Sequence, residues 1–171
     1  VQMSKASMRS ILPRFNSERM VLDYTRGFYL AALRNGKAFH ADDGRLAREL
    51  AEWKSNVRVK WPLIRAERVD HALPHLTHGE VLELRVAVDV DGLSADDIRV
   101  ECQFGQMSNS AHFELNAHYT LEPEGLDDKG RQLYALKLQP PLAGLQVYRI
   151  RIVPHHPALT HPYEMGCMLW L

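Results

Sequence analysis

The sequence predicts an α+β protein in which helices come first and strands follow. In the first third of the chain, apolar residues recur every three or four positions, which places them on one face of a helix. Beyond Pro62 apolar and polar residues alternate, which is the period of a half-buried strand. Proline also ends helices, because it lacks the N–H and clashes with the preceding turn. We therefore expect a helical segment over residues 1–62 and an all-β domain over residues 63–171.

Three helices are expected in the first segment. The first covers residues 3–12 and ends at Pro13. The third covers residues 43–60 and begins at the acidic pair Asp42-Asp43, where negative charge suits the helix dipole. It has one apolar face, made of Leu46, Leu50, Trp53, Val57 and Trp61. Part of that face is expected to pack against the β domain.

The second helix, over residues 17–33, is the most apolar. Asn16 or Ser17 caps its first turn, and Glu18 places negative charge at the positive end of its dipole. The run 34–37, Arg-Asn-Gly-Lys, is expected to end it, because Asn and Gly tolerate left-handed backbone. Two apolar stripes run along the helix: Met20, Val21, Tyr24, Phe28, Ala31 and Ala32, and Leu22, Tyr29 and Leu33. They cover more than half of its circumference, so the helix needs more than one neighbour.

Seven strands are expected in the second domain, over residues 64–69, 82–90, 98–104, 113–121, 131–138, 146–153 and 164–171. Short alternating strands separated by turn-rich segments are typical of an antiparallel sandwich of immunoglobulin-like type. Tyr148, at the start of the sixth strand, lies where such folds place a tyrosine corner. The inward positions predict a core that includes Leu84, Val86, Val100, Phe113, Leu115, Tyr148 and Ile150.

Four short motifs follow one another near the N-terminus: Met8 to Ile11, Phe15, Asn16 to Arg19, and Asp23-Tyr24. They resemble the Met/Arg-Ser helix, the Phe, the Ser/Asn-(Asp/Glu)-Arg cap and the Asp-Tyr or Glu-Tyr pair that close the catalytic part of bacterial α-glucan (glycogen or maltodextrin) phosphorylases. The rest of the chain, through the run Ile-Val-Pro-His-His-Pro at 152–157, resembles the β-rich C-terminal extension of the same subgroup.

The resemblance implies a parent enzyme, a glycosyltransferase that uses pyridoxal phosphate to phosphorolyse α-1,4-glucan to glucose 1-phosphate. It also implies that this chain is the C-terminal part of that parent, with residues 1–62 completing the catalytic domain. The chain begins with Val1 and enters a helical pattern at once, as expected for a piece of a longer protein. The missing catalytic domain is then the first expected partner. Without it, the helix at 17–33 is expected to pair with its copy in a homodimer.

No residue of this chain is expected to be catalytic or to bind a cofactor. In the family the pyridoxal phosphate lysine lies in a Gly/Ser/Asn-rich motif that ends Asn-Met-Lys, and this sequence has no such motif. Its lysines take polar faces or turns, where a solvated ammonium is a poor Schiff-base former: Lys5, Lys37, Lys54, Lys60, Lys129 and Lys137. The piece itself is therefore expected to be non-catalytic, with a structural or interface role.

Two groups of histidines are interpreted as solvated loops rather than metal sites. The groups are His71, His75 and His78, and His155, His156 and His161. Prolines interrupt both, whereas metal ligands must converge from fixed elements. No metal ligand is assigned to the sequence.

Cys102 and Cys167 are expected to be free thiols. Their strands would be the third and the seventh with the sixth between them, and two strand spacings of about 4.8 Å each exceed the reach of a disulfide. Free thiols suit a reducing compartment. The sequence also shows no signal peptide and no apolar run of membrane-spanning length, so we expect a cytoplasmic protein without a membrane partner.

Nucleic acid is not an expected partner, although the charge is uneven. Residues 1–65 hold 13 of the 21 Lys and Arg but 6 of the 21 Asp and Glu. The positive charges are spread along helices without interleaved aromatic residues or a known DNA-binding motif. We interpret these charges as forming a solvated face, or as attracting the acidic half of the chain to the basic half.

Glucan binding by the sandwich is a weaker expectation than a structural role. The inward-facing strand positions hold Phe104, Phe113, Tyr119 and Tyr148. The remaining surface candidates for stacking on sugar are Tyr134, Tyr163 and Trp170. The alternative to a phosphorylase piece is a stand-alone carbohydrate-binding or protein-interaction module, and the gene upstream of Val1 would discriminate the two.

Overall fold

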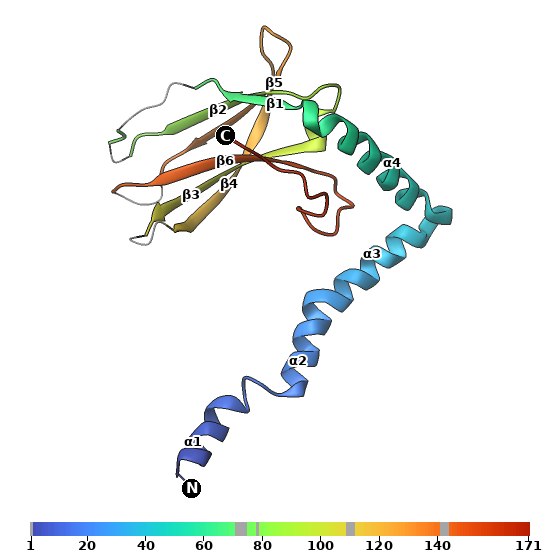
Figure 1. Cartoon of the computed structure of the whole chain (residues 1–171), viewed down its shortest axis with the longest axis vertical. Helices are drawn as coiled ribbons and strands as arrows, with labels where there is room; N and C mark the ends of the chain where they lie inside the picture. Colours follow the sequence, from blue (N-terminus) through green and yellow to red (C-terminus); the bar gives the residue numbers. More distant parts are fainter. Residues whose placement is uncertain (1, 71–74, 78, 109–111, 141–143) are drawn as a thin grey trace. The chain divides into compact units, whose positions relative to one another are not determined.

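The protein forms two compact units, Val1–Ala51 and Glu52–Leu171. Figure 1 shows the computed structural model, which describes residues 2–70, 75–77, 79–108, 112–140 and 144–171. The first unit is helical and the second holds the described strands, which confirms the α+β class. The division between the units falls inside the last helix rather than after Pro62. The domain bounds 1–62 and 63–171 stay a prediction. Within the described ranges, no helix is long and apolar enough to cross a membrane.

The first unit is a series of helices: α1 (Gln2–Ile11), α2 (Ser17–Tyr24), the π-helical turn η1 (Thr25–Tyr29), α3 (Leu30–His40), the 3-10 turn η2 (Ala41–Gly44) and the start of α4 (Arg45–Lys60). The Asn16 side chain caps α2, as predicted, by accepting the N–H of Arg19 at 2.7 Å. The predicted stop at residues 34–37 is wrong, because the helix continues to His40.

The helical run ends at Asp42 and Asp43 instead. Both have left-handed backbone, with φ of 50° and 54°, which Asp tolerates because its short side chain bonds locally. Gly36, in contrast, stays helical inside α3. Glycine permits a left-handed stop without requiring one, and keeping it in a helix costs only about 1 kcal/mol.

The helices α1, α2 and α3 and the turn η1 leave most of their apolar side chains in solvent. No residue of α1, α2, η1 or α3 is buried. Both apolar stripes of the predicted second helix are represented among the exposed side chains: Met20, Val21, Leu22, Tyr24, Phe28, Tyr29 and Leu33. Their contacts are local, as between the rings of Tyr24 and Phe28, whose centroids lie 5.8 Å apart. The described residues of these helices therefore form no core of their own.

The described residues of the second unit form seven strands, in agreement with the predicted number: β1 (Arg65–Arg68), β2 (Leu82–Asp89), β3 (Ile98–Met107), β4 (Phe113–Leu126), β5 (Gln132–Leu138), β6 (Val147–Pro154) and β7 (Leu169–Trp170). All paired neighbours are antiparallel, in the order β1-β2-β5-β4-β3-β6-β7. The long β4 pairs with β3 over residues 113–121 and with β5 over residues 122–126. It thereby joins the strands into one curled sheet, and the immunoglobulin-like type stays a prediction.

The core of the second unit lies on the inner face of this sheet. Of the predicted core residues, Leu84, Val86, Val100 and Ile150 are buried and Tyr148 is half-buried. The prediction is wrong for Leu115, which is 54% exposed, and Phe113 is only half-buried. The register explains both, because Phe104 pairs with Ala117 but the next residue, Gly105, pairs with Leu115. The extra residue, Asn116, forms a bulge that moves the start of β4 to the opposite face.

The second half of α4 belongs to the second unit. Val57 is fully buried in the sheet's core, and the Trp53 indole donates a 2.7 Å hydrogen bond to the Asp97 carboxylate ahead of β3. The Lys54 ammonium pairs with the Glu164 carboxylate in the segment after β6, and Lys60 donates to the Gly92 carbonyl at 2.9 Å. These contacts fix the helix end, the turn before β3 and the segment after β6 to one another.

Candidate functional site

The outer face of β3, β6 and β7 carries a cluster that we call the arginine–aromatic face: Glu101, Gln103, Phe113, Arg149, Arg151, Tyr163 and Trp170. Side chains alternate along a strand, and the core takes Val100, Cys102 and Ile150. The intervening positions therefore point outward. The register sets Gln103 opposite Arg149, and Glu101 opposite Arg151, which is in turn opposite Trp170.

A buried ion pair lies at the centre of this face. Arg151 Nε is 2.6 Å from Glu101 Oε2, and the two side chains are only 10% and 3% exposed. The same carboxylate oxygen lies 3.2 Å from His118 Nε2 on β4. One row along, Arg149 donates to the side-chain oxygen of Gln103 at 3.2 Å. A buried charge is tolerated when it is paired and hydrogen-bonded in this way.

Aromatic rings cover both guanidinium groups. The guanidinium carbon of Arg149 lies 3.8 Å from the ring centroid of Phe113 and 5.1 Å from that of Trp170. That of Arg151 lies 4.8 Å from the Tyr163 centroid and 5.8 Å from the Trp170 centroid. Since significant cation–π contacts occur about once per 70–80 residues, four on one small face form a concentrated feature. Trp170 is nevertheless 45% exposed and Tyr163 41% exposed, so both rings are held and still accessible.

Tyr163 is held by a folded segment rather than a free loop. Arg151 donates a hydrogen bond to its phenol oxygen. The backbone N–H of Tyr163 donates to the His161 ring at 3.1 Å, and that of Thr160 donates to the Glu164 carboxylate at 2.9 Å. The Lys54 hydrogen bond keeps the pKa of Glu164 below its ordinary value despite partial burial. The segment around Tyr163 is thus tied to α4 by an ion pair.

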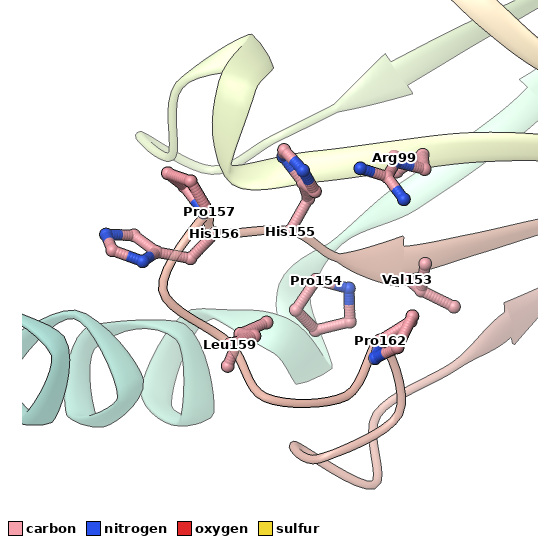
Figure 2. Close-up of a pocket in the computed structure, with 8 residues that line it drawn as sticks. All are labelled: Arg99, Val153, Pro154, His155, His156, Pro157, Leu159 and Pro162. Atoms are coloured by element: carbon pink, nitrogen blue, oxygen red, sulfur yellow. The ribbon is translucent and has the colours of Figure 1, made fainter. Parts of the chain in front are cut away.

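A pocket of about 200 Å³ lies where β3 begins and β6 ends. Figure 2 shows its lining side chains: Arg99 from β3, Val153 and Pro154 from β6, and His155, His156, Pro157, Leu159 and Pro162 from the segment that follows. Arg99 is held through its backbone, opposite Val153 in the ladder of β3 and β6. The lining is otherwise dominated by prolines and aliphatic groups, which offer few polar atoms to fix a ligand.

In the described part of the chain, no group of three or more His, Cys, Asp or Glu residues could hold a metal ion. His71 and His78 lie outside the described residues, and His75 is exposed. His155 Nδ1 lies 3.2 Å from the Asp96 carbonyl, and the His156 ring lies 4.9 Å from that of Trp53. His155 and His156 therefore make structural contacts.

Both cysteines are free, as predicted. Cys102 is buried on β3, and burial raises the pKa of its thiol to about 12. Burial also raises the pKa of the half-buried Cys167. The predicted order is confirmed, since β6 lies between β3 and β7.

Of the three aromatic residues predicted to lie on the surface, one is buried and two are exposed. Tyr134 is wrong as a surface candidate, because it is 2% exposed and its hydroxyl donates to the Ala95 carbonyl at 2.9 Å. Tyr163 and Trp170 are on the surface, as predicted. Sequence reasoning missed the residues that hold these rings, Arg149, Arg151 and Glu101. The available signal was the pair of arginines at alternating positions of one otherwise apolar strand.

The comparisons with known proteins assign the chain to a family. The family model described as "Glycogen phosphorylase C-terminal domain" matches residues 61–171, which include the whole sheet. The chain belongs to this family. It is 32% identical to the maltodextrin phosphorylase of Thermococcus litoralis over 99% of its own length and 20% of that protein. It is 27% identical to the glycogen phosphorylases of Mycobacterium bovis and Mycobacterium tuberculosis, over 97% of its length and 20% of theirs.

These matches confirm the predicted resemblance to the C-terminal region of an α-glucan phosphorylase. The chain spans about one fifth of the length of the curated relatives it matches. The matched relatives align with the helical unit as well as the sheet, because they cover nearly all of this chain.

Proposed function

We propose that this chain is the non-catalytic C-terminal region of an α-glucan phosphorylase, with a structural and interface role. The parent enzyme phosphorolyses α-1,4-glucan to glucose 1-phosphate. The observation that carries the proposal is the helical unit, in which α1, α2 and α3 bury no residue although they carry two apolar stripes. A surface of this kind is typical of an element that another part of a protein covers.

The energetics favour a large partner for this unit. Burying apolar surface contributes about 25 cal/mol per Å², so covering a few hundred Å² of these helices contributes several kcal/mol. The relatives are about five times longer than this chain, since it spans 20% of their length. The rest of the parent, its catalytic domain, is the occupant we propose. In its absence the same surface pairs with its copy in a homodimer.

The lysines of this chain do not fit the pyridoxal phosphate of the parent. Lys54 and Lys137 pair with carboxylates, and Lys60 donates to a backbone carbonyl. Exposed positions hold Lys5, Lys37 and Lys129, and none of the six lines the pocket. A Schiff-base lysine instead needs a desolvated or cationic setting that lowers its pKa. We therefore place the cofactor lysine in the remainder of the parent, and the two free thiols support a reducing, cytoplasmic setting.

The test is reconstitution from two polypeptides. The upstream part of the parent gene and this chain are expressed separately and mixed with maltodextrin and phosphate. We expect glucose 1-phosphate from the mixture, none from this chain alone, and no internal-aldimine absorbance in this chain alone. Phosphorolysis by this chain alone, or a fully active upstream polypeptide that does not bind it, would overturn the proposal.

A further inference from the structure

We propose that the arginine–aromatic face binds a linear α-1,4-glucan chain, with Trp170 and Tyr163 as the rings on which sugar units stack. This inference rests on the proposed function for the identity of the glucan. It adds a binding site on the outer face of β3, β6 and β7, separate from the helical interface of the first unit.

The first argument is that both rings are held in place before a ligand arrives. Arg151 contacts both rings, at 4.8 Å from the Tyr163 centroid and 5.8 Å from the Trp170 centroid, and Arg149 contacts Trp170. Arg151 is fixed in turn by the buried Glu101 carboxylate. A ligand that stacks on a pre-positioned ring loses less of its binding energy to side-chain ordering.

The second argument is the alternation of stacking surface and hydrogen-bonding groups. The exposed rings of Trp170 and Tyr163 both contact the Arg151 guanidinium. The neighbouring strand β4 adds His118 opposite Gln103 and Thr120 opposite Glu101. The His118 side chain is 41% exposed. A glucan presents C–H faces that stack on aromatic rings and hydroxyls that hydrogen-bond to these polar groups. Small-molecule sites commonly combine an aromatic lining with a few polar groups in this way.

The third argument is charge. The Glu101 carboxylate already neutralises Arg151, and Arg149 is engaged by Gln103 and two rings. A neutral ligand therefore displaces no ion pair when it binds. An anionic ligand that paired with Arg151 would have to displace Glu101, which is costly because it leaves one charge unpaired. Of the two guanidinium groups, that of the exposed Arg149 is the one that an anion could approach without this cost. The face suits an uncharged, polyhydroxylated chain.

Trp, Tyr and Arg also dominate protein interfaces, so the upstream polypeptide is the competing occupant. The experiment uses the full chain and maltoheptaose, titrated by calorimetry at up to roughly millimolar ligand. We expect binding that Trp170→Ala weakens by about tenfold, equal to about 1.4 kcal/mol, while Trp170→Phe retains most of the affinity. Phe15→Ala removes a ring of the helical unit that is more exposed, 73% against 45% for Trp170, and is expected to leave the affinity unchanged.

Circular dichroism of each variant reports that the sheet is intact. Failure of the wild-type chain to bind maltoheptaose would overturn the inference. Affinity that survives Trp170→Ala would also overturn it, as would a Trp170→Ala effect confined to binding of the upstream polypeptide. The reconstitution assay decides the proposed function separately, because phosphorylase assembly does not require this face to hold sugar.

Discussion

The ring of Phe113 at the start of β4 lies directly against Gly105 on β3. A Cβ atom placed on Gly105 would come within 2.8 Å of the Phe113 ring and 2.1 Å of the Glu114 carbonyl oxygen. The Phe113 ring also contacts Arg149, whose guanidinium carbon lies 3.8 Å from the ring centroid. The bulge at Asn116 creates this contact by moving Phe113 to the outer face.

Gly105→Ala is therefore expected to destabilise the second unit by about 1–3 kcal/mol, the usual cost of overpacking. The added methyl group meets backbone, which cannot move aside without disturbing the ladder. Chemical unfolding followed by the near-ultraviolet signal measures the loss. Gly36→Ala is the control, since nothing lies within 4 Å of its added Cβ and alanine favours a helix. An unchanged midpoint for Gly105→Ala would contradict the contact.

The same residues show what the sequence could predict of the fold and the site. Strand number and most of the inner face follow from alternation, which is a local property. The strand order around Cys102 and Cys167 follows instead from the topology of the expected sandwich. Alternation fails at Asn116 because a bulge depends on the partner strand, and it therefore misplaced Leu115. The helix stop at Asp42-Asp43 was missed because Gly36 offered an equally good local signal. The outer cluster depends on pairing between distant strands, so the sequence predicted only Tyr163 and Trp170 of its members.

Glu101→Gln is expected to cost about 3 kcal/mol, because it leaves the Arg151 guanidinium buried without its counter-charge. The control is Lys137→Gln, which removes an exposed 3.4 Å pair with Glu83 on the same sheet. An exposed pair of this kind contributes at most about 1 kcal/mol. Thermal unfolding of the two variants side by side is the measurement. Equal effects would mean that the Glu101–Arg151 pair behaves as a surface pair.

Trp53→Phe is expected to destabilise the second unit by about 1–2 kcal/mol. The change keeps an aromatic ring near His156 but removes the 2.7 Å hydrogen bond to the Asp97 carboxylate, and bonds to charged groups contribute about 1.5–3 kcal/mol. Urea unfolding reports the loss. If Trp53→Phe and wild type unfold at the same urea concentration, the indole N–H does not anchor α4 to the turn before β3.

Acid is expected to release the segment after β6 from α4. The Lys54 hydrogen bond lowers the pKa of Glu164 in the folded state. The resulting stability is therefore fully present above the ordinary value of 4.5 and is lost as the pH falls toward the lower folded pKa. Stability profiles between neutral pH and pH 3 should converge for wild type and Glu164→Gln at the acid end. Parallel profiles would show that Glu164 does not titrate with folding.

Sedimentation of the full chain, alone and with the upstream polypeptide, tests the central claim that the helical unit is an interface. At tens of micromolar, roughly the range in which a contact of several kcal/mol is visible, we expect the chain alone to self-associate and to bind a hydrophobic dye. With the upstream polypeptide present, we expect a one-to-one complex, loss of dye binding, and new protection of residues 17–33 from hydrogen exchange. A clean monomer that binds neither the dye nor the upstream polypeptide would contradict the account.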